Sequence, residues 1–264
     1  MNRSMNCVEI SISIVAYDQR HYLERLLPSL VASARLAPTE ILVVDHRSQD
    51  GTGEYVRRHF PSVQVLRNDV RAGYGENHNR NLARARGKYF VIMNTDLLVG
   101  EDVFVRLRDY LEAHPDVGMV SPKVLNEDGS IQGLNKRFPT LCDLFLRRFI
   151  PRRLLPRFRS RLDRYEMRDV GYDRSCDVEF LSGSFMFCRT PLLRSIGAFD
   201  HRYFLYFEDV DLCRRFQQLA RTVYYPDVSV VHLWKRSAHK NWIYTYYFMR
   251  SALTYFRRWG WRLA

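Results

Sequence analysis

The sequence predicts an α/β protein with a parallel, doubly wound central sheet and helices on both of its faces. Three observations support this fold class. Short apolar runs rich in β-branched residues alternate with helical patterns up to about residue 100. The intervals between the runs are short, which favours parallel strands joined by right-handed crossovers. The run at 89–93 ends abruptly in polar residues, as strands of open sheets do where they meet a ligand.

The elements of the first half follow in order. Strands are expected at 8–16, 40–44, 63–66 and 89–93, and helices at about 23–34, 54–59 and 75–85. Pro38 closes the first helical region, and turn residues at 46–52 precede the second. We expect this half to bind a nucleotide or a similar ligand at its strand ends.

The stretch 89–99 carries the main prediction about chemistry. Five apolar residues are followed by Asn94, Thr95 and Asp96. Because alternate residues of a strand share a face, Asn94 and Asp96 can both point at one hard cation that carries a diphosphate. The alternative is a strand followed by an ordinary polar turn.

The second half has a less regular pattern. A helix is expected at 103–114, strands at 117–124, 178–189 and 228–231, and further helices at 191–197, 208–220 and 242–261. The strand at 178–189 contains Ser182 and Gly183, and glycine there indicates either close approach of a ligand or a bulge.

A basic segment at 136–172 interrupts this pattern. Eight arginines between residues 147 and 164 alternate with large apolar residues. Such a segment suits an anionic membrane surface, although a basic segment packed on its own domain is the main alternative. A nucleic-acid patch is less favoured, since no known nucleic-acid-binding motif accompanies it.

Acidic residues begin the helix at 208, directly after an aromatic run. Glu208, Asp209 and Asp211 are explained in part by the helix dipole. A carboxylate beside aromatic rings can also be poorly hydrated, as a general base requires. His232 ends the last strand, where it is either structural or a contact for a metal or a diphosphate.

Composition limits the partners and the compartment. The chain has 264 residues, 46% of them hydrophobic, and a net charge of +12, so we expect a globular enzyme with an anionic partner. Five scattered cysteines without metal spacing indicate a reducing compartment. No signal peptide or spanning stretch is recognisable, which predicts a cytoplasmic protein, soluble or peripheral on the membrane.

Five motifs follow one another along the chain. They are Ser-Ile-Val-Ala-Tyr at 13–17, Val-Val-Asp-His-Arg-Ser-Gln-Asp-Gly-Thr at 43–52, Ala-Gly-Tyr-Gly-Glu-Asn-His-Asn-Arg-Asn at 72–81, Met-Asn-Thr-Asp at 93–96, and Tyr-Phe-Glu-Asp-Val-Asp-Leu-Cys at 206–213, followed by Val-Val-His at 230–232. Together they resemble the motifs of family 2 glycosyltransferases of GT-A fold, in particular the bacterial rhamnosyltransferase-like branch. The resemblance covers residues 10 to about 255.

The resemblance implies a role for each matching residue. The nucleotide-sugar site would comprise Ala16, Tyr17, Asp45, Ser48, Asp50, Arg71, Gly73, Asn79, Asn94 and Thr95. Asp96 and His232 would hold the metal, Mg²⁺ or Mn²⁺, and Asp209 beside Glu208 would deprotonate the acceptor. Ser182, Gly183 and Asp211 would lie on the acceptor side. Two departures from the family pattern are Asn94, where an acid is usual, and Asn81, where a glycine is usual.

The resemblance implies a single GT-A domain over 1–264, with a mixed, mostly parallel central sheet flanked by helices. Residues 1–100 would bind the nucleotide sugar, residues 101–240 would form the acceptor half with the basic insertion, and 241–264 would be a terminal amphipathic helix. The implied reaction is inverting transfer of a sugar, most simply L-rhamnose from dTDP-rhamnose, to a glycan or polyprenyl-diphosphate-linked glycan of the cell surface. A UDP-hexose donor is the close alternative.

Other classes fit the sequence less well. Gly73-x-Gly75-x-x-His78 lacks the third glycine of a dinucleotide-binding motif and follows the third strand, and no P-loop is present. A sugar nucleotidyltransferase, which would release inorganic diphosphate, and a noncatalytic basic binding protein remain as alternatives.

Overall fold

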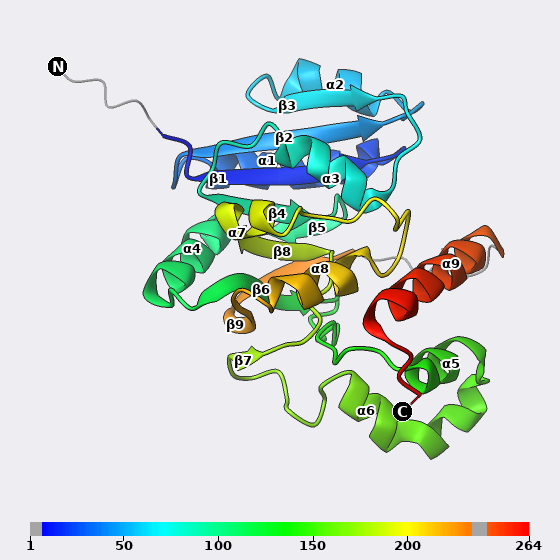
Figure 1. Ribbon diagram of the computed structural model, residues 1–264. Coiled ribbons are helices and arrows are strands. Elements are labelled where there is room, and N and C mark those ends of the chain that lie inside the picture. Colours follow the sequence, from blue (N-terminus) through cyan, green and yellow to red (C-terminus); the bar gives the residue numbers. More distant parts are fainter. Residues whose placement is uncertain (1–6, 234–241, 264) are drawn as a thin grey trace.

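The computed structural model describes residues 7–233 and 242–263 and shows a central sheet with helices on both faces (Figure 1). Within these residues the sheet has nine strands, in the order β3-β2-β1-β4-β8-β6-β9-β5, with β7 paired to β9. The predicted α/β class with a mixed sheet is confirmed.

The first half is parallel throughout. Its strands are β1 (Ile10–Ala16), β2 (Thr39–His46), β3 (Gln64–Asn68) and β4 (Tyr89–Met93). Its helices are α1 (Arg20–Ser33), α2 (Thr52–His59) and α3 (Tyr74–Leu82). Parallel pairing of β2, β1 and β4 brings their carboxyl ends to one edge of the sheet.

The second half mixes the two strand directions. It contains β5 (Leu97–Val99), α4 (Val103–Ala113), β6 (Val117–Leu125), β7 (Cys176–Asp177), β8 (Phe185–Arg189), α7 (Thr190–Ser195), α8 (Glu208–Phe216), β9 (Arg221–His232) and α9 (Trp242–Trp259). β8 runs antiparallel between β4 and β6, while β6 and β9 are parallel and β5 is antiparallel to β9.

Each face of the sheet has its own apolar core. α1, α2 and α4 pack on one face, and α3, α7, α8 and α9 contribute to the core of the other. In β1 the isoleucines at 10, 12 and 14 face the first core, so the alternate Ser13 faces α3. Asn81 of α3 donates hydrogen bonds there to Ser13 Oγ over 2.9 Å and to the carbonyl oxygens of Ile14 and Leu42. Asn81 therefore fastens α3 to two strands.

The basic segment forms a small helical layer at a distance from the sheet (Figure 1). It consists of α5 (Leu141–Phe149), η1 (Arg152–Phe158) and α6 (Arg159–Tyr165). A capping box of Thr140 and Asp143 begins α5, and the backbone N–H of Leu141 donates to the carbonyl oxygen of Arg262 over 2.9 Å. The C-terminal residues thus lie against the start of α5.

Three predicted boundaries are wrong. Ser182 and Gly183 are not inside a strand: β8 begins at Phe185, because the N–H of Gly183 bonds to a side chain of α8 instead of to a neighbouring strand. The helix that begins at Glu208 ends at Phe216 instead of near residue 220. β9 begins seven residues before the predicted strand, since a register irregularity opposite Pro122 accommodates the interruption of its pattern at Pro226.

Candidate active site

The predicted turn at 94–96 lies between β4 and β5 and is fixed from three sides. The backbone N–H of Asn94 donates to the carbonyl oxygen of Ser184 over 3.0 Å. Thr95 Oγ1 bonds to Gln19 Oε1 over 2.8 Å, and the carbonyl oxygen of Asp96 accepts from Leu233 N over 2.8 Å. Contacts from three distant segments therefore set the direction in which Asp96 points.

Asp96 and His232 meet at this turn. Leu97 lies opposite His232 in the β5–β9 pairing, and His232 Nε2 is 3.1 Å from Asp96 Oδ1. The other ring nitrogen, Nδ1, is 2.9 Å from Gln132 Oε1, while Gln132 Nε2 donates to the carbonyl oxygen of His232 over 3.2 Å. An amide oxygen only accepts, so this contact requires a proton on Nδ1.

The arrangement on the other ring nitrogen fits a cation. With Nδ1 protonated, a neutral His232 carries its lone pair on Nε2, which faces a carboxylate oxygen. Either a second proton or a cation must lie between these two acceptors. A carboxylate and an imidazole oriented by an amide are a common ligand pair. In residues 7–233 and 242–263 there is no group of three or more His, Cys, Asp or Glu that could hold a metal. Any ion bound here would take further ligands from substrate or water.

A chain of hydrogen bonds leads from the turn at 94–96 to α8. The buried Tyr74 hydroxyl lies 3.0 Å from Asn94 Oδ1 and 2.8 Å from the carbonyl oxygen of Gly183. Burial raises the pKa of Tyr74 well above its usual value, so the hydroxyl remains a donor. The N–H of Gly183 donates in turn to Asp209 Oδ2 over 3.1 Å. Asn94, Gly183 and Asp209 are thus brought together.

Glu208 and Asp209 occupy the first turn of α8, after two residues with left-handed backbone. Tyr206 and Phe207 have φ values of 69° and 66°, a conformation that costs a residue with a side chain roughly 1–2 kcal/mol. Glu208 is only 6% exposed, and its Oε2 has no hydrogen-bond partner in the described part of the chain. Backbone strain at 206–207 and an unpaired buried oxygen on Glu208 are typical of a ligand-binding site.

Both carboxyls bind protons more tightly than usual. Burial, reinforced by the charge of Asp209, raises the pKa of Glu208 well above its ordinary value. Burial also raises the pKa of Asp209, although the Gly183 N–H and the charge of Lys136 oppose this. Both groups are therefore more basic than usual, and burial favours the protonated form of Glu208 in particular.

Lys136 was not among the residues predicted from sequence. Its ammonium lies 5.1 Å from the centre of the Phe180 ring, and its backbone exchanges hydrogen bonds with that of Phe180. Burial and the charge of Arg147 lower the pKa of Lys136 to about 8. Gln132 and Tyr74 were also not predicted. No sequence pattern marks Gln132 or Lys136 as a site residue, whereas Tyr74 lies in the motif at 72–81.

The nucleotide-side residues cluster at the ends of β1 and β2. Ala16 pairs with Asp45 in register, and Asp45, only 1% exposed, accepts a hydrogen bond from Ser48 N over 3.2 Å. Tyr17 is 59% exposed beside them. Ser48 Oγ accepts from Asp18 N over 3.1 Å, and Asp50 accepts from Arg20 N over 3.0 Å. These bonds tie the loops after β1 and β2 to each other.

Arg71 and Gly73 lie where α3 begins. The Arg71 guanidinium is 5.1 Å from the centre of the Phe204 ring and bonds to the hydroxyl of Tyr247. A Cβ on Gly73 would lie 2.6 Å from the carbonyl oxygen of Phe204, so only glycine permits this approach. The start of α3 is thus packed against the aromatic loop 203–207.

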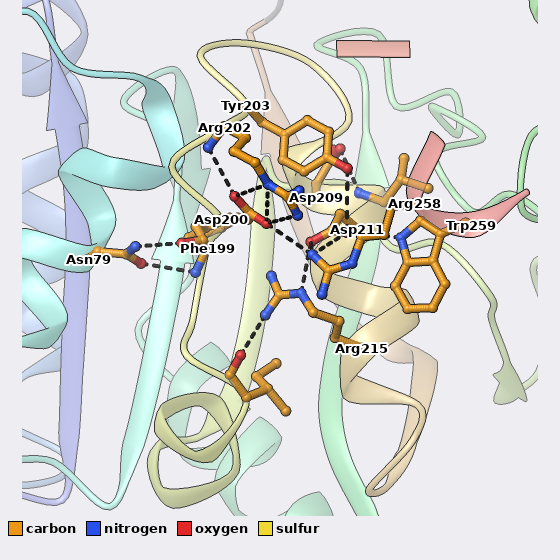
Figure 2. A network of polar contacts seen from close by, with 12 residues as sticks. Asn79, Phe199, Asp200, Arg202, Tyr203, Asp209, Asp211, Arg215, Arg258 and Trp259 are labelled. Atoms are coloured by element: carbon orange, nitrogen blue, oxygen red, sulfur yellow. Dashed lines mark hydrogen bonds and ion pairs between the residues drawn. The ribbon is translucent and has the colours of Figure 1, made fainter. Parts of the chain in front are cut away.

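Three of the predicted residues already have hydrogen-bond partners within the protein. The Asn79 amide makes two hydrogen bonds with the backbone of Phe199, of 2.7 and 3.0 Å, instead of pointing at a ligand. Asp211 is fully buried and accepts from Arg215 and Trp259, with Arg258 and Tyr203 beside it (Figure 2). Ser182 Oγ accepts from Ser184 N over 3.3 Å.

One cavity lies apart from these residues. It has a volume of about 380 Å³, lies between the start of α4 and the β5–β9 edge, and is lined by none of the candidate site residues.

The sequence comparisons identify the family. The family described as "Glycosyl transferase family 2" matches residues 11–181. The chain belongs to glycosyltransferase family 2. The N-acetylglucosaminyl-diphospho-decaprenol L-rhamnosyltransferase of Mycobacterium tuberculosis is 30% identical over 84% of this chain and 75% of its own. The rhamnosyltransferase WbbL of Escherichia coli is 24% identical over 84% and 83%. The glycosyltransferase is therefore rhamnosyltransferase-like, as predicted.

Solved structures share the GT-A fold of this glycosyltransferase. The mannosyltransferase PcManGT from Pyrobaculum calidifontis, solved with GDP-Man and Mn²⁺, aligns with a TM-score of 0.64 and 19% identity over 94% of this chain and 64% of its own. S. aureus TarS, solved with UDP-GlcNAc, aligns with a TM-score of 0.60 and 18% identity. The chain spans 60% of that TarS chain.

Proposed function

We propose that this glycosyltransferase transfers L-rhamnose from dTDP-rhamnose, with inversion, to a polyprenyl-diphosphate-linked glycan in the synthesis of a cell-surface polysaccharide. The donor sugar and the lipid-linked acceptor are supported by the names of the curated relatives. The observation that carries the mechanism is Asp209, a carboxylate of raised pKa linked through Gly183 and Tyr74 to the turn of Asn94.

In the proposed step Asp209 accepts the proton of an acceptor hydroxyl as its oxygen attacks the anomeric carbon. The bond from that carbon to the diphosphate breaks, and the nucleoside diphosphate leaves on the opposite face. A carboxylate with a raised pKa is a stronger base, and one positioned base contributes about 10² to 10⁴ in rate. Because burial raises the pKa of Glu208, this neighbour would be available as a hydrogen-bond donor in its protonated form, without a second negative charge beside Asp209.

Asp96 and His232 would hold Mg²⁺ or Mn²⁺, which when bound neutralises the charge that develops on the leaving diphosphate. The motif acid usual at position 94 is an amide here, and its oxygen already accepts from Tyr74. We therefore expect the protein alone to bind the ion loosely, with the donor diphosphate completing its coordination.

The remaining predicted residues would bind the donor. Asp45, with Ala16, Tyr17, Ser48 and Asp50 around it, would bind the base at the ends of β1 and β2. Arg71, with Gly73, would approach the diphosphate, and Thr95 would keep the turn in place through Gln19. Ser182 and Gly183 would border the acceptor. In this proposal residues 1–100 form the donor half and residues 101–240 form the acceptor half.

A lipid-linked acceptor implies work at a membrane. In the described residues no helix is long and apolar enough to cross a bilayer. We propose a cytoplasmic enzyme bound peripherally to the inner face of the plasma membrane.

The deciding experiment is a product assay on the Asp209→Asn variant with a panel of dTDP-rhamnose and UDP-hexoses. Wild type should release a nucleoside diphosphate, fastest with dTDP-rhamnose, and the variant should lose about 10² to 10⁴ in turnover with an unchanged melting temperature. Asp173→Asn, at an exposed position, is the matched control. Near-normal transfer by Asp209→Asn would rule out its role as base. Faster turnover of a UDP-hexose would contradict dTDP-rhamnose as the donor. Release of inorganic diphosphate would indicate a nucleotidyltransferase. Binding of sugar nucleotides without turnover would indicate a noncatalytic protein.

A further inference from the structure

The terminal helix α9 has two faces of different character. One face is buried, with Tyr247, Ser251, Ala252, Tyr255 and Phe256 at most 8% exposed. The other carries Trp242, Tyr246, Met249 and Leu253, which are 78%, 53%, 51% and 39% exposed. Their spacing of four, three and four residues places them along one line of the helix. We call these four residues the α9 stripe.

The segment of sequence that carries the α9 stripe has only positive charges. The sequence from residue 228 to the C-terminus contains seven lysines and arginines and no acidic residue. Arg250 and Arg257 are exposed and seven residues apart, so both lie along one edge of the stripe. Trp261 and Leu263, which are 56% and 74% exposed, extend the apolar surface beyond the helix.

The buried face of α9 connects the stripe to the active site. Ser251 Oγ donates to the carbonyl oxygen of Leu205 over 2.9 Å, and Phe248 and Tyr255 pack on Phe207, which immediately precedes Glu208. At the C-terminal end, Arg258 and Trp259 bond to Asp211 of α8 (Figure 2). α9 lies toward the side to which β1 and β2 point (Figure 1). The stripe is therefore held in a fixed relation to Asp209.

We propose that the α9 stripe is the surface on which this enzyme binds an anionic lipid bilayer. An amphipathic helix with Trp and other apolar residues on one face and arginine beside them lies in the plane of the interface, its apolar face about 5–10 Å into the headgroup and acyl boundary. Trp and Tyr are favoured at that depth because they are amphipathic. A second copy of this chain is a poorer occupant, since pairing two such helices would bring their arginines together without an acid to neutralise them.

This inference deepens the proposed function, and rests on it in one respect, namely that the acceptor is lipid-linked. It also narrows the sequence prediction, which gave membrane contact to both 147–164 and 242–261. In this proposal the α9 stripe makes the principal apolar contact, and the arginines of the basic segment would add long-range attraction.

The test measures co-sedimentation of the whole protein, without substrate, with vesicles of phosphatidylcholine alone or mixed with phosphatidylglycerol. We expect binding to the anionic vesicles only. The Met249→Glu/Leu253→Glu double variant should bind at least tenfold more weakly, whereas Leu36→Glu, which changes an equally exposed leucine of the first half, should bind as wild type does. Arg250→Gln and Arg257→Gln should each weaken binding about fivefold, with the effect disappearing at high salt.

Fold and catalysis are monitored separately. Melting temperatures and hydrolysis of the sugar nucleotide in solution should be unchanged in the double variant, so a failure of the lipid proposal would be distinguishable from a failure of the proposed function. Absence of vesicle binding by the wild type, or equal binding by the double variant, would overturn the proposal. So would a dimer in solution that the double variant converts to a monomer with no change in vesicle binding.

Discussion

The backbone N–H of Gly183 donates a hydrogen bond to Oδ2 of Asp209 over 3.1 Å, which joins the segment before β8 to the first turn of α8. A Cβ at position 183 would lie 3.3 Å from Asp209 Cβ and 3.5 Å from its Oδ2. An alanine at position 183 would therefore displace the Asp209 carboxylate by a few tenths of an ångström without disturbing the core.

Gly183→Ala should therefore lower kcat about tenfold or more while the melting temperature changes little, because positioning contributes strongly to catalysis. Steady-state kinetics and thermal unfolding measure the two effects. Gly100→Ala is the matched control, since a Cβ there would meet its neighbours only at 3.6 and 3.7 Å, an ordinary contact distance. Equal activity in the two variants would mean that the Gly183 contact does not position the base.

The activity of the enzyme should rise with pH through the raised pKa of Asp209. A general base works only when ionised, so kcat falls as the pH drops below that pKa, and the fall begins at a higher pH than an ordinary aspartate would give. Lys136→Met should move this limb to still higher pH, because the ammonium of Lys136 helps to stabilise the carboxylate. The pH profile of kcat checks both expectations, and an unshifted profile in Lys136→Met would contradict the coupling.

Glu208 should make the fold less stable as the pH rises. Its pKa is raised in the folded protein, so the folded state binds this proton more tightly than the unfolded state does. The associated stability is present below the unfolded value of about 4.3 and is lost as the pH rises through the folded pKa. Glu208→Gln, which keeps the neutral shape, should therefore flatten the fall in melting temperature above that range. A variant whose melting temperature falls with pH as steeply as that of wild type would show that Glu208 is not the group concerned.

Sequence reasoning identified the fold and the polar ends of the strands because both depend on local patterns. β2 and β4 contain continuous apolar runs, and Asp45 and Asn94 stand where those runs stop, while β1 alternates isoleucine with serine before it ends in Val15 and Ala16. The predicted bounds of the four parallel strands of the first half therefore agree with the observed ones to within a few residues.

The parts that sequence reasoning missed depend on contacts between distant residues. Gln132 and Lys136 lie in irregular chain and reach the site only because β6, β8 and β9 converge there. Asp211 resembled its neighbours Glu208 and Asp209 in sequence, yet the helix turns it toward Arg215 and α9. Membership of a motif does not distinguish a carboxylate that is available to a ligand from one that holds two helices together.

His232 and Gln132 should determine the affinity for the metal. His232→Ala removes one of the two proposed protein ligands, so the concentration of Mn²⁺ that gives half-maximal activity should rise at least tenfold. Gln132→Leu leaves both ligands but frees the imidazole from the amide that sets its tautomer, and should raise that concentration by about 10- to 100-fold, as loss of an orienting partner commonly does. Metal titration of activity measures both, with the exposed His59 replaced by Gln as the control. If all variants required the same concentration of Mn²⁺ as the wild type, neither His232 nor Gln132 would contribute to metal binding.

Asp211 should matter for stability more than any surface carboxylate. Its side chain is completely buried and accepts from Arg215 over 2.7 Å and from Trp259 over 2.9 Å, with Arg258 at 3.2 Å (Figure 2). Asp211→Ala leaves these donors buried without an acceptor, and breaking a buried pair in this way costs about 3–5 kcal/mol. Asp69→Ala removes the partner of Arg67. The Asp69 side chain is 68% exposed, and such surface pairs contribute only about 0–1 kcal/mol. Urea unfolding of both variants measures the contrast.

Because Asp211 also fastens α9 to α8, Asp211→Ala should loosen the C-terminal helix first. Hydrogen exchange across 242–259 should then increase at urea concentrations where the sheet is still protected. Simultaneous loss of protection in the sheet and in α9 would show that the cluster supports the whole domain and not the attachment of this helix.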